Sequence, residues 1–314
     1  MRIPEDKAAG EEAVSETMIA KEYSISLCIC TMNRSEDLDK CLESVLRCAQ
    51  QPSEIIVSDD SPDPLPNKAI LKKYPTVTYQ TGPRQGLGPN RNACIRTAQG
   101  THLMFIDDDV CVPSDFFSVA YRLISETPEA VITGHEIKHR SWEGTTQKVL
   151  PKNADFWGIM RIPVMPDNCC SVVMNSTIFP AALFQQALFD ECLRYGYEEL
   201  DIARHAVALN YKIVHNEALW VDHYQSLVDR ESNWKLKFAS QMYTTAKAYL
   251  YYEGAVHKLL TYAVLAPLKI TGSLIRRKDP KALQKGMQST ISAYQHFFSK
   301  KEKGFAGRKP HIVG

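Results

Sequence analysis

Short apolar runs alternate with helical patterns over roughly the first hundred residues of the chain. Four of these runs are β-prone and predict strands: SISLCIC (24–30), EIIVSDD (54–60), TVTYQT (76–81) and HLMFI (102–106). Between them, one helix is predicted to begin with Ser35 as its N-cap, a short one covers 68–74, and one within 82–100 ends with Gly100 as its C′ residue. This alternation predicts a mostly parallel sheet with helices on both faces.

The pattern is less regular after residue 130. The predicted elements are a strand at 130–134, a long loop region at 138–168, a strand at 169–179, helices at 180–189 and 197–210, a strand at 212–224, and helix throughout 231–300. These patterns divide the chain into an N-terminal arm (1–22), an α/β domain (23–230) with halves 23–135 and 136–230, and a basic helical C-terminal extension (231–314).

Charge is distributed unevenly, although the formal net charge of the 314 residues is only +1. Residues 231–314 carry 15 Lys or Arg against 4 Asp or Glu, which gives +11. The whole chain has 37 against 36, so 22 against 32, or −10, are left for residues 1–230. An acidic body and a basic extension are expected to meet different partners, unless the basic helices are simply solvated.

The N-terminal sequence lacks the apolar stretch of a secretion signal, and residues 1–22 are predicted to be a loosely attached arm. Nine cysteines without such a signal are typical of a reducing compartment. Cys28 and Cys30 alternate with apolar residues in a predicted strand, where a small buried hydrophobe is the expected role. These features predict a cytoplasmic protein.

Three consecutive aspartates, Asp107, Asp108 and Asp109, follow the fourth predicted strand. They stand at a carboxyl end of the predicted sheet, where ligands of such sheets bind. Three adjacent carboxylates repel one another unless a cation such as Mg²⁺ or Mn²⁺ neutralises them, and a diphosphate can complete the shell of such an ion. Side chains alternate along an extended segment, so Asp107 and Asp109 are expected to share one side. Taken alone, the cluster is equally typical of a solvated acidic turn or a helix N-cap.

Several ordered motifs resemble family 2 glycosyltransferases. The runs ISLCICTMNRSEDLDKCLESVL, EIIVSDDSPD and GLGPNRNACIRTAQGTHLMFIDDDV are similar to the nucleotide-sugar half of that family, and FDECLRYGYEELDIARHAVALNYKIVHNEALWVDHYQS is similar to its acceptor half. The resemblance covers about residues 24–226. It implies the GT-A (Rossmann-like) fold and transfer of a sugar from a nucleoside-diphosphate sugar to an acceptor hydroxyl with inversion, assisted by Mg²⁺ or Mn²⁺, in polysaccharide or glycoconjugate biosynthesis.

The resemblance also implies roles for individual residues. The nucleotide-sugar site would comprise Thr31, Asn33, Asp59, Arg91, Asp107 and Asp108. Within it, Asp59 would contact the base, Arg91 belongs to the loop over the nucleotide, and Asp107 would face the ribose. The metal ligands would be Asp109 and the late His223, since imidazole can ligate Mn²⁺; a satisfied surface histidine is the alternative for His223.

The base that deprotonates the acceptor is expected among Glu198, Glu199 and Asp201, in the first turn of a helix. The family usually has Glu-Asp at this point, and this sequence has Glu198-Glu199. Glu199 aligns with the usual aspartate and is the favoured base, although a first turn also attracts acidic residues through the helix dipole alone.

The extension contains LLTYAVLAPL (259–268), which lies between Lys258 and Lys269 and is too short to span a bilayer. It is expected either to lie on an anionic membrane through 255–285 or to pack as a core helix. A membrane-bound helix would suit a lipid-linked acceptor and a protein held at the inner face of the membrane. A glycan acceptor is compatible with either placement of the helix. No nucleic-acid partner is expected.

Two other functions are compatible with the pattern. A nucleotidyltransferase of similar topology usually has a Gly-rich, basic loop after the first strand, which TMNRS does not supply. A non-catalytic module would keep the nucleotide-sugar site, and the altered Glu198-Glu199 pair permits that alternative.

Overall fold

The computed structural model describes residues 22–140, 142–166, 168–193, 196–225 and 234–276, together with single positions between 278 and 295. Nearly all of the predicted N-terminal arm, and most of the chain after residue 276, lies outside these described residues.

The first half of the chain is a parallel strand–helix alternation. Its elements are β1 (Ile25–Thr31), α2 (Ser35–Leu46), β2 (Glu54–Asp59), α3 (Leu65–Leu71), β3 (Val77–Thr81), α4 (Leu87–Thr97), β4 (His102–Asp107), β5 (Val110–Cys111) and α5 (Phe116–Glu126). Strands β3, β2, β1 and β4 are neighbours in that order and all run parallel. The four predicted strands therefore exist and pair as expected.

The second half completes the sheet and adds helices. Its elements are β6 (Val131–Arg140), β7 (Thr145–Val149), β8 (Lys152–Ala154), β9 (Met160–Pro163), the 3₁₀ helix η1 (Met174–Ser176), β10 (Thr177–Pro180), α6 (Ala181–Phe184), α7 (Glu198–Ala208), β11 (Ile213–Tyr224), α8 (Trp234–Lys247), the π-helix η2 (Ala248–Tyr252) and α9 (Val256–Arg276). The sheet continues in the order β4, β10, β6, β11, β5, with β7 paired to β6. Here the pairing is mixed, since only β6 and β11 run parallel. The strands β10, β5 and β7 thus add antiparallel pairings to the predicted parallel sheet.

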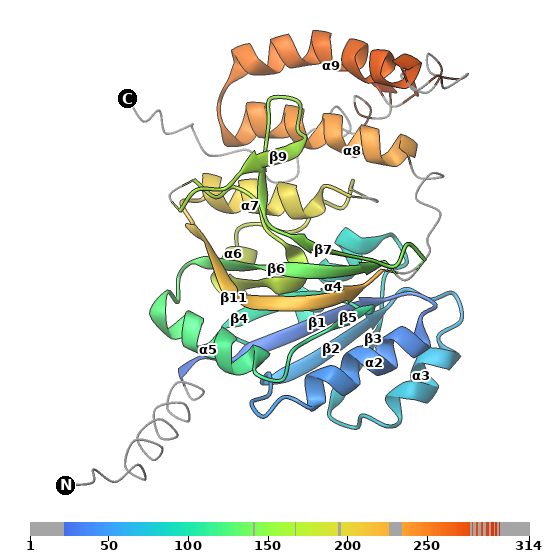
Figure 1. The fold of residues 1–314 in the computed structure, drawn as a ribbon, viewed down its shortest axis with the longest axis vertical. Helices are drawn as coiled ribbons and strands as arrows, with labels where there is room; N and C mark the ends of the chain where they lie inside the picture. Colours follow the sequence, from blue (N-terminus) through green and yellow to red (C-terminus); the bar gives the residue numbers. More distant parts are fainter. Residues whose placement is uncertain are drawn as a thin grey trace, which may run out of the picture.

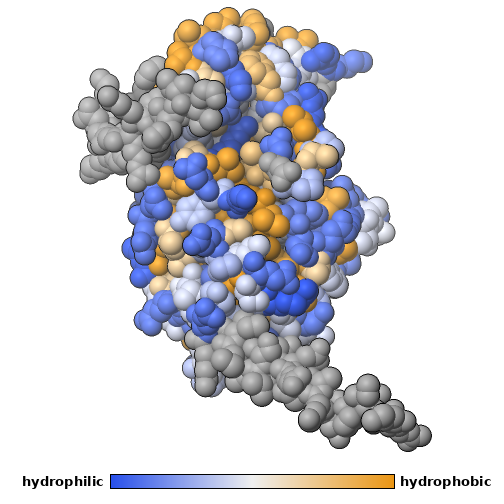
Figure 2. Space-filling model, turned by 90° about the vertical axis from the view of Figure 1, so that its left-hand side faces the viewer, coloured by the Kyte–Doolittle hydropathy of each residue, from blue (hydrophilic) through white to orange (hydrophobic). Residues whose placement is uncertain are grey.

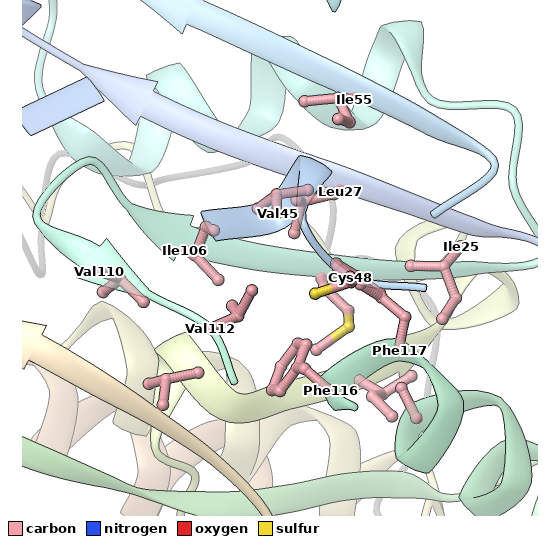
Figure 3. Packing of buried hydrophobic residues seen from close by; sticks show 14 of the residues in the cluster. Ile25, Leu27, Val45, Cys48, Ile55, Ile106, Val110, Val112, Phe116 and Phe117 are labelled. Carbon is pink, nitrogen blue, oxygen red and sulfur yellow. The ribbon is translucent and has the colours of Figure 1, made fainter. Parts of the chain in front are cut away.

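Strand β1 lies between two hydrophobic cores, one on each face of the sheet. Its seven residues are all buried, and alternate side chains point to opposite faces of the sheet. Ile25, Leu27 and Ile29 pack with residues of α2 and α5, whereas Cys28 and Cys30 pack with residues of α4 and α7. Figure 3 shows part of the first core, in which side chains of the strands meet those of α5. A strand buried on both faces has the continuous apolar run that made it predictable.

Several predicted boundaries are wrong for local reasons. Arg34 occupies the N-cap of α2, and Ser35 is its first helical residue. Helix α3 begins at Leu65 and not at 68. The proline that follows Leu65 does not prevent this, because proline is tolerated in the first turn of a helix. Gly100 is not the C′ residue of α4, since that helix already has Ala98 as its C-cap; a Cβ at Gly100 would lie 2.8 Å from the backbone nitrogen of Ser26.

The region after β6 departs most from the prediction. The loop predicted at 138–168 contains the end of β6 and strands β7, β8 and β9, and the strand predicted at 169–179 is regular only from Thr177. The helix predicted at 180–189 is one turn, α6. Strand β7 is exposed along most of its length and is held by pairing with β6, so no apolar alternation marks it in the sequence.

The helices of the extension pack on the remainder of the fold. Figure 1 shows α8 and α9 as layers beyond α7, at the end of the molecule opposite α2 and α3. Lys247 of α8 is buried and its Nζ lies 2.7 Å from a carboxylate oxygen of Asp190 and 2.7 Å from one of Asp201. The hydroxyls of Tyr243 and Tyr252 donate to the same two carboxylates, at 2.7 and 3.1 Å. This buried group, the Lys247 cluster, fastens α8 to α7.

Candidate active site

The carboxyl ends of the parallel strands meet at one edge of the sheet, as the sequence predicts. In the register of the sheet, Thr31 at the end of β1 pairs with Asp59 of β2, and its neighbour Cys30 pairs with Asp107 of β4. Strand β11 reaches the same edge from the second half, where His223 pairs with Val110 of β5. Residues far apart in the sequence are thereby brought together.

Asp108 is held by residues of β1 and of the loop that follows it. It is buried; the Thr31 hydroxyl donates to its Oδ2 at 2.7 Å and Arg34 Nη1 donates to its Oδ1 at 3.0 Å. Burial raises the pKa of Asp108 to about 7, against the opposing effect of Arg34. Arg34 also donates to Asp109 Oδ2 at 2.9 Å, so this arginine, which sequence reasoning missed, ties the loop after β1 to the aspartates.

Asp107, Asp109 and His223 form the candidate metal centre. Each offers one ligand atom, and these atoms lie within 4.8 Å of one another. Asp109 Oδ1 is buried 3.2 Å from His223 Nε2 but lacks a hydrogen bond of acceptable geometry among the described residues. Two carboxylates and an imidazole suit a divalent metal, and such an ion would satisfy this buried oxygen. The residues present therefore fit a divalent metal.

Glu136 of β6 holds the other side of the His223 ring, with its Oε2 2.9 Å from Nδ1. Burial alone would raise the pKa of Glu136, but His223 and Lys138, whose Nζ lies 2.8 Å away, lower it to about 2. Burial alone would lower the pKa of His223, because it disfavours the charged imidazole, but the carboxylates of Asp109 and Glu136 raise it to about 10. The ring thus lies where positive charge is strongly favoured. A carboxylate behind a histidine is the usual outer partner of a metal ligand.

Asn175 of η1 also escaped prediction. Its Oδ1 accepts the backbone N–H of Asp107 at 2.9 Å, and its Nδ2 donates to Glu136 Oε2 at 3.1 Å. It therefore fixes the start of the aspartate run relative to β6. Glu136 lies just beyond the strand predicted at 130–134, and nothing local in the sequence marks Asn175.

Arg91 of α4 connects the two halves of the site. It is buried, with Nη2 3.4 Å from Asp107 Oδ1 and Nη1 3.4 Å from Glu198 Oε1. Its guanidinium lies over the ring of Phe189, 5.4 Å from the centroid. A planar guanidinium with several donors suits such a shared position between two carboxylates.

The three candidate bases occupy different surroundings in the first turn of α7. Glu198 is buried in the pair with Arg91, and Asp201 is buried in the Lys247 cluster. Glu199 is half-buried, and burial together with the charge of Glu198 raises its pKa to about 7. Tyr197, just before the helix, has φ of 74°, an uncommon conformation for a bulky residue. Of the three, Glu199 is the one whose carboxylate forms no salt bridge with another described residue.

The expected nucleotide loops are in contact through Ser61. The backbone N–H of Asn33, which has φ of 57°, donates to Ser61 Oγ at 2.8 Å. The backbone N–H of Ser61 donates to Asp59 Oδ1 at 2.8 Å, and the Tyr79 hydroxyl donates to Oδ2 at 3.2 Å. Asp59 is fully buried, and its two carboxylate oxygens accept these hydrogen bonds from the loop after β2 and from β3.

A sheet with helices on both faces and a carboxylate–histidine centre at the strand ends is the arrangement expected of a GT-A domain. The chain belongs to glycosyl transferase family 2, because the sequence model of that family matches residues 26–193, more than half of the 314 residues. The resemblance seen in the sequence is therefore confirmed.

Relatives share part of their length with this chain. The uncharacterized glycosyltransferase YwdF of Bacillus subtilis is 35% identical over 189 residues, which are 57% of this chain and 63% of YwdF. The amylovoran biosynthesis glycosyltransferase AmsE of Erwinia amylovora is 25% identical over 177 residues, 54% of this chain and 66% of AmsE. An uncharacterized glycosyltransferase of Rickettsia conorii is 25% identical over 197 residues, but these are only 32% of that protein and 62% of this chain. The chain thus spans about a third to two thirds of these relatives.

Solved structures share the fold. GalNAc-T7 with UDP, GalNAc and Mn²⁺ has a TM-score of 0.55 at 18% identity, covering 65% of this chain and 44% of that one. TarS of S. aureus in complex with UDP-GlcNAc has a TM-score of 0.55 at 14% identity, covering 88% of this chain and 91% of that one. These likenesses confirm the predicted GT-A fold with its C-terminal helical part.

Proposed function

We propose that this protein transfers a sugar from a nucleoside-diphosphate sugar to an acceptor hydroxyl with inversion, and that a divalent metal assists. The observation that carries this proposal is a continuous polar network. It runs from the candidate metal centre of Asp107, Asp109 and His223, through Arg91, to the carboxylates of α7. Groups suited to a donor diphosphate and groups suited to an acceptor hydroxyl therefore border one site.

Glu199 is proposed as the general base. It would take the proton of the acceptor hydroxyl while that oxygen bonds to the anomeric carbon and the bond from this carbon to the diphosphate breaks on the opposite face. A base works best with a pKa near the working pH, and burial beside Glu198 raises the pKa of Glu199 to about 7. Glu198 is held by Arg91 and Asp201 by Lys247, so both act better as structural charges.

The base is tested by Glu199→Gln, with Asp201→Asn as a comparison within the same helix turn. Glu199→Gln is expected to lower the transfer rate by about 10²–10⁴-fold, the usual contribution of general-base catalysis. Donor affinity, measured by calorimetry, is expected to stay unchanged. Full turnover in Glu199→Gln would move the assignment to Glu198, and tight donor binding by the wild type without turnover would favour a non-catalytic module.

The cofactor is proposed to be Mg²⁺ or Mn²⁺, held by Asp109 and His223 with Asp107 beside them. Such an ion, when bound, neutralises charge on the departing diphosphate. In support, one structure of similar fold was obtained with UDP and Mn²⁺ and another with UDP-GlcNAc. A panel of nucleotide sugars with Mn²⁺ should contain one that raises the melting temperature of the wild type by mass action. Asp109→Ala is expected to abolish that metal-dependent rise, and its persistence would exclude Asp109 as a ligand.

The acceptor is proposed to be a growing glycan or a lipid-linked glycan of a polysaccharide or glycoconjugate, used at the inner face of the membrane. The name of AmsE, an amylovoran biosynthesis glycosyltransferase, supports a polysaccharide. No helix among the described residues is long and apolar enough to cross a membrane.

A further inference from the structure

Helix α9 carries apolar residues on two opposite faces. The inner face packs against α8 and η2 through Tyr262, Ala266 and Ile270, which are at most 6% exposed. The other face carries a second row with the same spacing of four. Its members are Val256, Leu260, Val264 and Leu268, continued by Ile275, and they are 50–67% exposed. We call this set the outer row of α9.

Helix geometry explains why the two rows cannot serve the same core. Two residues along a helix are separated by about 200° of rotation, so Val264 points away from the side on which Tyr262 is buried. A helix that meets water on its outer side normally has polar residues there. Single exposed apolar side chains are common, but a continuous row marks an interaction surface. Figure 2 shows apolar side chains, in orange, gathered at the end of the molecule where Figure 1 places α9.

The charges around the outer row suit an anionic surface. No Asp or Glu occurs between Val256 and Arg276, and Arg276 and Lys278 are exposed at the end of the helix. Glu253, which precedes the helix, is paired with Lys258 at 2.9 Å. The 231–314 extension carries +11 in all, so a negatively charged partner is favoured over a neutral or basic one.

The chemistry of the outer row suits lipid better than protein. Its members are aliphatic and lack the Trp, Tyr and Arg side chains that dominate protein interfaces. The hydroxyl of Thr261, exposed beside the row, donates to the His257 carbonyl at 3.0 Å and so already has a partner within the helix. We propose that α9 lies flat on an anionic lipid surface, with its outer row turned into the lipid and its cationic end at the headgroups. The inference extends the proposed function, since a membrane-held acceptor would then be used by a membrane-held enzyme.

The test is flotation of the full chain with vesicles, using a matched pair of variants. Leu260→Gln with Leu268→Gln removes the centre of the outer row. Leu46→Gln with Leu65→Gln removes two exposed leucines of α2 and α3, at the other end of the molecule. The wild type and the control pair are expected to bind vesicles of one part phosphatidylglycerol to three of phosphatidylcholine. The outer-row pair is expected to bind about tenfold to a hundredfold more weakly.

The charge part is tested separately. Binding is expected to fall in pure phosphatidylcholine and in high salt, and by about fivefold for each cation removed in Arg276→Gln and Lys278→Gln. Equal binding of the outer-row pair and the wild type, equal binding to neutral vesicles, or no binding at all would overturn the proposal. A wild type that is dimeric while the outer-row pair is monomeric would also overturn it, because a second copy would then cover the outer row. Donor hydrolysis is expected to persist in the outer-row pair; its absence from every variant and the wild type would refute the proposed function while leaving the vesicle result intact.

Discussion

Replacing Glu136 by glutamine tests whether the candidate metal centre depends on a residue that does not touch the metal. Glu136 Oε2 lies 2.9 Å from His223 Nδ1, and His223 Nε2 is the atom that faces Asp109. Glutamine keeps the size and a hydrogen-bond acceptor but removes the charge. The imidazole then becomes a poorer ligand and its orientation is less fixed.

The expected magnitude follows from that arrangement. Removal of the outer partner of a metal-binding histidine typically weakens metal affinity by about 10- to 100-fold. This corresponds to about 1.4–2.7 kcal/mol. The effect is expected near the upper end, because Glu136 is buried and little solvent can replace its charge.

Mn²⁺ binding to the full chain, measured by calorimetry or from the electron paramagnetic resonance signal of free Mn²⁺, is the direct assay. Glu217→Gln is a matched control, since Glu217 pairs with Lys148 at 2.8 Å as Glu136 pairs with Lys138, but on the surface. That control is expected to bind Mn²⁺ like the wild type. An unchanged Mn²⁺ affinity in Glu136→Gln would show that His223 is not a ligand or is positioned by something else.

Three further outcomes concern stability. Glu199→Gln is expected to stabilise the fold by about 2–3 kcal/mol above pH 7, because burial raises the pKa of Glu199 from 4.5 to about 7 and its ionised form therefore opposes folding. Urea unfolding should show this gain vanish as the pH falls to 4.5, and a gain independent of pH would contradict it. Lys247→Met should lower the free energy of unfolding by about 3–5 kcal/mol, because it leaves two buried aspartates unpaired. Lys237→Met, at an exposed position, should change it little, and equal unfolding midpoints of the two variants would contradict the stabilising role of the Lys247 cluster. Gly134→Ala should lower the melting temperature sharply, since its Cβ would lie 1.7 Å from a carbonyl oxygen of β11, whereas Gly272→Ala, which meets no atom within 4 Å, should not; similar melting curves would refute this.

The parts of the fold that could be predicted are those whose environment is uniform along the chain. Strands β1, β2 and β4 are buried on both faces and have continuous apolar runs. Because parallel strands end at one edge, the placement of Asp59 and Asp107 together follows from the strands alone. Strand β7 could not be predicted in this way, because it is exposed and exists only through its pairing with β6.

The parts of the site that escaped prediction depend on contacts between distant residues. Glu136 is 87 residues from His223 in sequence, and its role is set by the parallel pairing of β6 with β11. The first turn of α7 shows the same limit. Glu199 and Asp201 look equivalent in a helical pattern, but only the position of Lys247 on α8 shows that Asp201 is already held.

The Lys247 cluster has a consequence for how this family can diversify. Lys247, Asp190 and Asp201 come from three separate segments, and the lysine cannot become apolar without leaving two buried carboxylates unpaired. The three positions are therefore expected to change together among relatives, with apolar or amide residues replacing the aspartates wherever the lysine is lost. A chimera with the C-terminal helices of another family member is expected to fold stably only if those helices place a cation at the position of Lys247.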